Sequence, residues 1–227
     1  MSVNNNYLIS KITHSQPFYS EENLIISVLE HIHHFLPADN IVTLTELRVG
    51  AGRVDIVAGQ VRSVSQSICS NLTNLEACVL SHLYYRKRLK ALTVSNKLGL
   101  ALSQVTDCLE KLCLKGYCVQ AGQCFVRNQL PITNVVAIEG KLQNWRKALT
   151  QASRNRLFTS QSFVALDARY ARPAIKNLQL FRNAKVGLAI VFNDDEIHIL
   201  HRPPHRPPIA DILPVMAESA LIAHITH

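Results

Sequence analysis

The sequence predicts a mixed α/β fold into which a second, smaller domain is inserted. Two observations lead to this prediction. Apolar residues recur at spacings of three and four in some segments and form extended runs in others, which are the patterns of helices and strands. Residues 66–130 follow a different rhythm from the outer parts, 1–65 and 131–227, which together continue one order of helices and strands. With 227 residues, 48% of them apolar, the chain can form a substantial core.

The first helix is predicted over residues 21–36. Apolar residues recur there at helical spacing, Ser20 can cap its start, and Pro37 ends it. Two extended runs, 41–49 and 52–58, follow and are joined by a two-residue loop that begins with glycine. Such a pair predicts a β-hairpin with a type II′ turn, whose first central residue needs a positive φ. The residues that face each other in this hairpin are Val49 and Gly52, Arg48 and Arg53, and Glu46 and Asp55.

The inserted segment is predicted to contain three helices and a hairpin. Its first helix has Thr73 and Glu76 at capping-box spacing. A short helical piece follows, and the third helix starts at Ser103 and ends at Gly116. The hairpin turns at Ala121-Gly122. The cysteines of this region lack the paired spacing of a zinc site, so we expect them to be buried core residues.

This order of elements resembles a winged helix-turn-helix domain over residues 72–126. The residues that carry the resemblance are LTNLEACVLSHL, LTVSNKLGLALSQV and LEKLCLKGYCV. Winged helices are common in nucleic-acid-binding proteins, and they also serve as protein-docking modules. The helix that would enter a DNA groove carries Asp107 and Glu110 beside Lys111 and Lys115, which is not a face that favours phosphates.

The last part of the chain, 131–227, is predicted to alternate strands and helices. Strands are expected over 132–142, 162–168, 186–192 and 196–202, and helices over 143–158, 174–181 and 209–225.

Charge is distributed unevenly along the chain. Residues 1–60 carry a net charge of −3, whereas residues 61–227 carry +11, which gives the chain its formal charge of +8. Two basic runs are candidates for contact with phosphates. Their candidate residues are Arg86, Lys87 and Arg88 in the first run, and Arg146, Lys147 and Arg154 in the second. A solvated surface is the alternative explanation, but the second run comes just after Lys141, a position that favours phosphate contact.

Glu139 and Lys141 interrupt an otherwise apolar strand, and their spacing places both side chains on one face of the sheet. Asp55 lies in a similar apolar setting, and buried charges need a partner or a cation. If these strands are neighbours, the carboxylates of Glu46, Asp55 and Glu139 converge with Lys141. Oxygen ligands of this kind suit Mg²⁺, which would polarise a phosphate and activate water. Glu46 has a second explanation, an ion pair with an arginine of the hairpin.

Asp55 in RVDIV, with Glu139 and Lys141 in AIEGK, resembles the signature of the PD-(D/E)XK nuclease superfamily, the restriction-endonuclease-like fold. The resemblance covers residues 21–58 and 135–192. It implies an αβββαβ core with the winged helix inserted between its second and third strands, bound Mg²⁺ (or Mn²⁺), and cleavage of nucleic-acid backbones. Asp55 and Glu139 would be metal ligands and Lys141 the residue that assists the attacking water.

The resemblance implies further site residues. Some branches of the superfamily supply an additional metal ligand from the first helix, here Glu22 in preference to Glu21, although Glu22 is also explained as an acid favoured at a helix start. Other branches place a glutamine on the helix after the Glu-x-Lys strand, which makes Gln151 a candidate for positioning the substrate. Asn155 stands where those branches often have tyrosine, and it is given no role.

These observations predict a Mg²⁺-dependent nuclease that acts on DNA, in defence or in DNA processing. Two alternatives stay open, a catalytically inert nucleic-acid-binding regulator that works through its winged helix and an RNA-cleaving toxin. Many members of the superfamily cut as dimers, so a homodimer is compatible with this function. No apolar run approaches the roughly 18 to 20 residues of a membrane span, and the start lacks the layout of an export signal. We therefore expect a cytoplasmic protein with no membrane contact.

Overall fold

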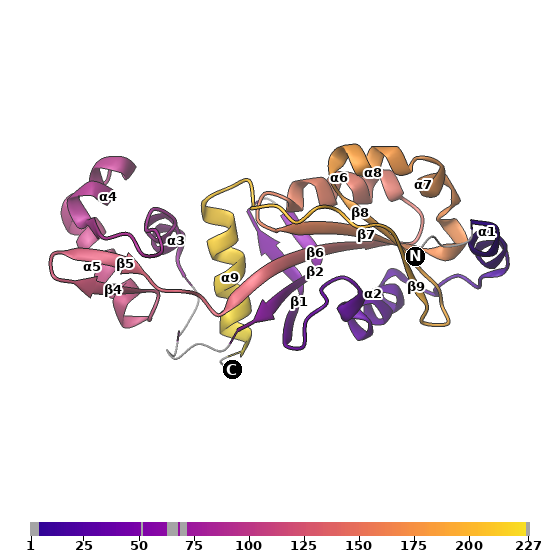
Figure 1. Cartoon of the computed structure of the whole chain (residues 1–227), viewed down its shortest axis with the longest axis horizontal. Helices are drawn as coiled ribbons and strands as arrows, with labels where there is room; N and C mark the ends of the chain where they lie inside the picture. The colour runs from indigo at the N-terminus through magenta and orange to yellow at the C-terminus, as the bar shows by residue number, and fades with distance from the viewer. Residues whose placement is uncertain (1–4, 51, 63–67, 69–71, 226–227) are drawn as a thin grey trace.

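A six-stranded mixed sheet lies at the centre of the larger part of the molecule (Figure 1). The structure is a computed structural model and describes residues 5–50, 52–62, 68 and 72–225. The strands lie in the order β1-β2-β6-β7-β8-β9, in which β6, β7 and β8 are parallel and all other neighbours are antiparallel. Their bounds are β1 Ile41–Val49, β2 Gly52–Val61, β6 Ile132–Lys141, β7 Gln161–Asp167, β8 Gly187–Val191 and β9 Ile197–His201.

Helices cover both faces of this sheet, which confirms the predicted mixed α/β architecture. On one face α2 packs Leu24 and Val28 against Ile56 and Ile138. On the other face α6 and the two helices after β7 form the crossover connections that parallel strands require, and they pack against Val164 and its neighbours. The helices and turns of this part are α1 Asn5–His14, α2 Glu21–Glu30, η1 Ile32–His34, α6 Trp145–Asn155, η2 Ala168–Tyr170, α7 Arg172–Lys176 and α8 Leu178–Ala184.

Two predicted helices differ from the observed ones. The helix expected over 21–36 ends at Glu30 and continues as the 3₁₀ turn η1, because the chain tightens as it approaches Pro37 while Leu36 still packs in the core. The helix expected over 174–181 is the pair α7 and α8. The hairpin register agrees with the prediction at Val49 and Gly52, and Gly50 has the expected positive φ of 58°. The second turn residue, Ala51, lies outside the described residues.

The segment between β2 and β6 forms a separate three-stranded sheet in the order β3-β5-β4, with three helices. The capping box of Thr73 and Glu76 is present as predicted. α5 begins at Leu102, one residue before the predicted start, and the hairpin turns one residue later than predicted, with Gly122 at a φ of 65°. Cys108 and Cys118 are buried and free, as expected of core residues, whereas Cys113 and Cys124, expected to be buried too, are free but only partly buried. The elements are α3 Asn74–Ser81, β3 Leu89–Lys90, α4 Ala91–Leu98, α5 Leu102–Leu114, β4 Cys118–Ala121 and β5 Cys124–Arg127.

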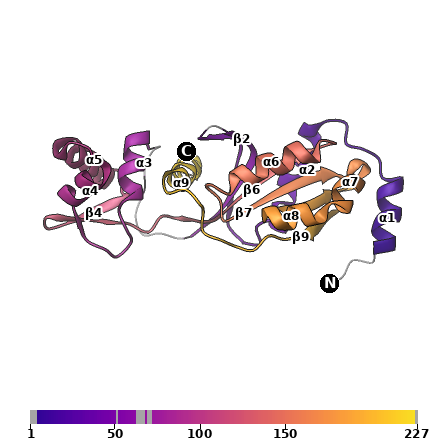
Figure 2. The ribbon, with the colours of Figure 1, turned by 90° about the horizontal axis from the view of Figure 1, so that it is seen from above.

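The last helix, α9 (Ile212–Ile225), lies between the two sheets, as both views show (Figures 1 and 2). Its residues Leu221 and Ile222 belong to one apolar core with Val57 of the large sheet and Leu80 of the inserted segment. Tyr117 Oη donates a hydrogen bond to Ser219 Oγ at 3.1 Å across this junction. Within the described ranges, α9 and the other helices fall short of the length and apolar character that a bilayer span requires.

Candidate active site

Two acidic side chains lie opposite each other on neighbouring central strands. Ile56 of β2 pairs with Ile138 of β6, and continuing this antiparallel register by one residue places Asp55 opposite Glu139. Opposed residues of such a pair share one face of the sheet. Asp55 Oδ2 also accepts a hydrogen bond from the backbone N–H of Gly140 at 2.9 Å. The strand pairing therefore brings together two carboxyl groups that are far apart in the sequence.

Lys141 completes this group at the end of β6. Its ammonium lies 3.4 Å from Asp55 Oδ2 and 3.0 Å from Glu21 Oε2, and it donates to the carbonyl of Gly140 at 2.7 Å. Burial by itself would lower the pKa of Lys141, but the hydrogen bonds and negative charges of Glu21 and Asp55 outweigh burial and raise the pKa above its ordinary value. Lys141 is therefore a fixed positive charge, and its side chain is only 12% exposed.

Glu139 is fully buried, with an exposed fraction of 0%. Its Oε1 accepts a hydrogen bond from Asn155 Nδ2 at 2.7 Å. Among the described residues no group donates a hydrogen bond to Oε2, although that atom is buried. Burial, together with the charge of nearby Asp55, raises the pKa of Glu139 to about 7, against the opposing effects of Asn155 and Lys141. A buried carboxylate oxygen without a donor, beside a second carboxylate, fits a divalent cation.

A cavity of about 480 Å³ is lined by Asp55 and Lys141 of this group, whereas the fully buried Glu139 does not line it. Glu21 and Glu22 line it from the start of α2, and Glu46 lines it from β1. Of the two helix acids, the structure places Glu21 and not the favoured Glu22 in contact with Lys141. Glu22 lines the cavity without such a contact. Glu46 forms an ion pair with Arg53, one of its two expected partners, and has a φ of 59°. Its carboxylate is therefore already neutralised, which weakens its case as a metal ligand.

α6 directs two amide side chains toward the sheet. Asn155 bonds Glu139, and Gln151, one helical turn earlier, has a buried Oε1 with no hydrogen-bond partner among the described residues. Sequence reasoning selected Gln151 and missed Asn155. The signal that could have found it is its spacing of four residues after Gln151, which places both side chains on one face of the helix.

The predicted phosphate-binding residues do not form one surface. Arg146, Lys147 and Arg154 are exposed on α6, and the guanidinium of Arg146 lies 4.6 Å from the centre of the Trp145 ring. Trp145 itself is a core residue, as expected. The residues Arg86, Lys87 and Arg88 are exposed on the inserted segment between α3 and β3.

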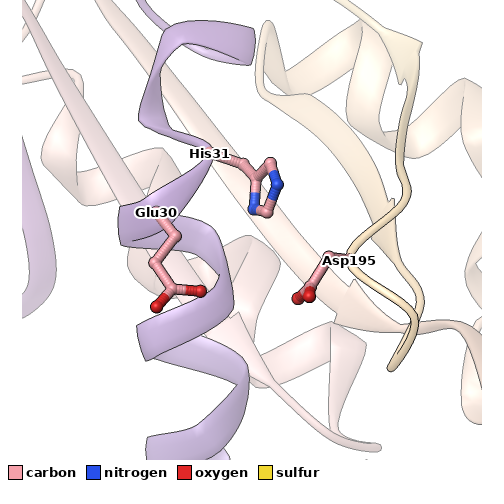
Figure 3. Close-up of side chains that lie close together, drawn as sticks. All are labelled: Glu30, His31 and Asp195. Carbon is pink, nitrogen blue, oxygen red and sulfur yellow. The ribbon is translucent and has the colours of Figure 1, made fainter.

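A second acidic group lies elsewhere on the surface. Glu30 and His31, at the end of α2, and Asp195, before β9, have ligand atoms within 4.8 Å of one another (Figure 3). Ser27 Oγ donates to Asp195 Oδ1 at 3.2 Å, and His31 Nδ1 lies 3.0 Å from the carbonyl of Ser27. Glu30 and Asp195 are exposed, so water satisfies their charges, and nothing else at this place indicates a ligand. The pair of the half-buried Asp55 and the fully buried Glu139 is the better candidate for metal chemistry.

No protein-family model, curated protein or solved structure matches this chain.

Proposed function

We propose that the chain is a metal-dependent nuclease of the PD-(D/E)XK superfamily that acts on DNA. The observation that carries this proposal is the buried, donor-free Oε2 of Glu139 beside Asp55, with the ammonium of Lys141 at 3.4 Å from Asp55 Oδ2. The order α2-β1-β2-β6-α6-β7 agrees with the αβββαβ core that the resemblance implies. The elements between β2 and β6 likewise agree in order with a winged helix.

Asp55 and Glu139 would hold the metal, Mg²⁺ or Mn²⁺. Both are hard oxygen donors, and they approach from adjacent strands whose pairing fixes their positions. When bound, the metal would supply Lewis-acid polarisation of the phosphate and a more acidic water. A cation would also relieve the cost of burying the Glu139 carboxylate, which otherwise holds a proton up to a pH of about 7.

Lys141 would act as a charge and not as a base. Because Glu21 and Asp55 raise its pKa, it keeps its proton at neutral pH. Its Nζ can donate to the attacking water or to a phosphate oxygen and so stabilise the negative charge that develops in the transition state. Glu21 holds the ammonium toward the cavity, which makes this acid of α2 a positioning residue.

α6, which packs on the face of the sheet opposite α2, would contribute contacts to the substrate outside the cavity. Gln151 has a buried amide oxygen without a partner among the described residues, and its side chain would have to turn outward to accept from a base or sugar edge. The exposed Arg146, Lys147 and Arg154 of the same helix can contact the phosphates on either side of the scissile bond.

The test is a cleavage assay on plasmid DNA, single-stranded DNA and RNA, with Mg²⁺, with Mn²⁺ or with EDTA. We expect metal-dependent fragments from DNA. The variants Asp55→Asn and Lys141→Gln should each reduce the cleavage rate by at least about 100-fold, the usual effect of removing one such group. Thermal unfolding of the purified variants should show that they stay folded.

Glu30→Gln is the matched control, because it removes an acid from the exposed group of Figure 3. It should leave cleavage unchanged. Full activity of Asp55→Asn, or loss of activity in Glu30→Gln, would refute the assignment of the site. A salt-sensitive gel shift without fragments under any metal condition would support the inert regulator, and fragments from RNA alone would support the toxin.

A further inference from the structure

Two tyrosines that are consecutive in the sequence are exposed on the surface of the inserted segment, away from the candidate active site. Tyr84 is 47% exposed and Tyr85 51% exposed, and they follow α3 directly. A pair of adjacent exposed aromatic rings is not needed for the core of this segment, whose large ring residues Tyr117 and Phe125 are buried.

Cations surround both rings. The Nζ atoms of Lys87 and Lys97 lie 5.4 Å and 5.3 Å from the centre of the Tyr84 ring, and the Cζ atom of Arg86 lies 5.1 Å from that of Tyr85. Lys97 comes from α4, so two separate elements contribute to the same place. We call this set, Tyr84, Tyr85, Arg86, Lys87 and Lys97, the tyrosine surface.

No negative charge opposes this surface from its own stretch of chain. Between Glu76 and Asp107 the sequence has five basic residues and no acidic one. The exposed face of α5, in contrast, carries Asp107 and Glu110. Since α5 also exposes Lys111, its charge is mixed, and a polyanion is attracted more strongly to the tyrosine surface than to this helix, the one that would enter the groove of a duplex.

The backbone holds the tyrosine surface in place. Tyr85 forms a bridge with Arg127 of β5, and its Oη donates to Gln129 Oε1 at 3.5 Å. Arg86 has a φ of 63°, a left-handed conformation that non-glycine residues adopt rarely. The rings therefore sit on a segment fixed to the small sheet, which lowers the entropy lost when a ligand stacks on them.

From these contacts we infer that the tyrosine surface binds single-stranded nucleic acid, with unpaired bases stacked on Tyr84 and Tyr85 and phosphates paired with the surrounding cations. Aromatic rings beside basic side chains are the combination that single strands require, because their base faces are free. A duplex hides its base faces and would use only the cations. This binding is separate from the proposed cleavage and does not depend on it.

The test is fluorescence anisotropy of the full chain in EDTA, with labelled single-stranded DNA, single-stranded RNA and duplex DNA of about 20 nucleotides. Single strands should bind more tightly than the duplex. Comparison of the two single-stranded probes shows whether DNA or RNA is preferred. Tyr84→Ala should weaken single-strand binding about 5- to 150-fold, the usual effect of losing one stacked base, whereas Tyr84→Phe should retain it. Lys87→Gln should reduce the salt dependence of the binding constant by the release of about one counterion.

Tyr19→Ala is the matched control, because Tyr19 is 98% exposed on the larger part and has no cation over its ring among the described contacts. It should bind as the unmodified chain does. Equal affinity for duplex and single strand, or identical loss in Tyr84→Ala and Tyr84→Phe, would overturn the inference. So would full displacement of the DNA by poly-glutamate of equal charge, which would indicate an acidic protein partner. If the chain binds single strands but does not cleave them, only the proposed nuclease activity is refuted. If it cleaves DNA and Tyr84→Ala does not weaken single-strand binding, only the proposed role of the tyrosine surface is refuted.

Discussion

Glu139 is the residue whose environment says most about the chemistry of this molecule. A fully buried carboxyl group is costly unless its oxygens are satisfied, yet in the described part of the chain only Oε1 has a donor. The nearby positive charge of Lys141 is shared with Glu21 and Asp55. Glu139 therefore either binds a cation or keeps a proton. Without a cation, its protonation should make the stability of the fold depend on pH.

In the absence of metal, we expect Glu139 to make the protein less stable as the pH rises. Its folded-state pKa is about 7 and its ordinary value 4.5, so the folded state holds the additional proton between these values. The contribution is fully present below a pH of 4.5 and is lost as the pH rises through 7, by a total on the order of 3 kcal/mol. Urea unfolding in EDTA between about pH 5 and pH 8 measures it.

Glu139→Gln is the reference for this measurement, because it keeps the acceptor for Asn155 and does not titrate. The free energy of unfolding of the unmodified chain should fall relative to that of the variant as the pH rises. Parallel curves would show that Glu139 does not hold the proton.

Asn155 should tune metal binding although it is not expected to touch the metal. Asn155→Ala removes the one donor that the described residues offer to Glu139 Oε1 and leaves the carboxylate free to rotate. Loss of such a supporting residue typically weakens metal affinity about 10- to 100-fold. Titration calorimetry with Mg²⁺ measures this change. Asn183→Ala, on an exposed helix position, should have no effect, and an equal loss in both variants would contradict the role.

At the scale of elements, periodicity predicted the strands better than the helix ends. For the strands of the large sheet, the predicted first and last residues lie within two residues of the observed ones. The exception is the end of β2, which was predicted at residue 58 and lies at Val61. The start of α5 and the turn at Gly122 were each wrong by one residue. The central strands of this sheet contain long apolar runs, which are a strong pattern, whereas caps and turns depend on a few backbone contacts that several neighbouring residues can provide.

β7 and β8 pack so closely that a side chain at Gly187 should destabilise the fold. A Cβ atom on Gly187 would lie 2.1 Å from the ring of Phe163, which faces it in the parallel register. Gly187→Ala should therefore destabilise the fold by about 1–3 kcal/mol. Gly52→Ala, where the nearest atom is 3.9 Å away, is the control and should change stability little. Chemical denaturation measures the free energy of unfolding of both variants. Equal values would show that the Phe163 ring moves aside freely.

For the molecule as a whole, α9 unites the two sheets into one core. Its apolar residues face both α3 and the large sheet, which explains why the helix is apolar on nearly every side. Arg127 of β5 also forms an ion pair with Glu218 of α9 at 3.4 Å. The inserted segment is therefore held by side chains that come almost 100 residues later in the chain.

We expect a substitution in α9 to weaken both parts together. Leu221 is fully buried, so Leu221→Ala should cost about 2–5 kcal/mol and lower a single unfolding transition. Ile225→Ala, at a position 44% exposed on the same helix, should cost much less. Differential scanning calorimetry separates the outcomes, because two transitions of which only one shifts would show that the parts unfold independently.

The amino-acid sequence was enough to predict the types of the main elements. It also singled out Asp55, Glu139 and Lys141 as charged residues within apolar strands. Hydrophobic periodicity is local, and a charge inside an apolar run signals a need for a partner without naming it. Tertiary structure decided the partners, because the register of β2 against β6 sets Asp55 opposite Glu139, and the packing of α2 and α6 brings Glu21 and Asn155 to them. Such choices depend on distances between segments that only the folded chain makes short.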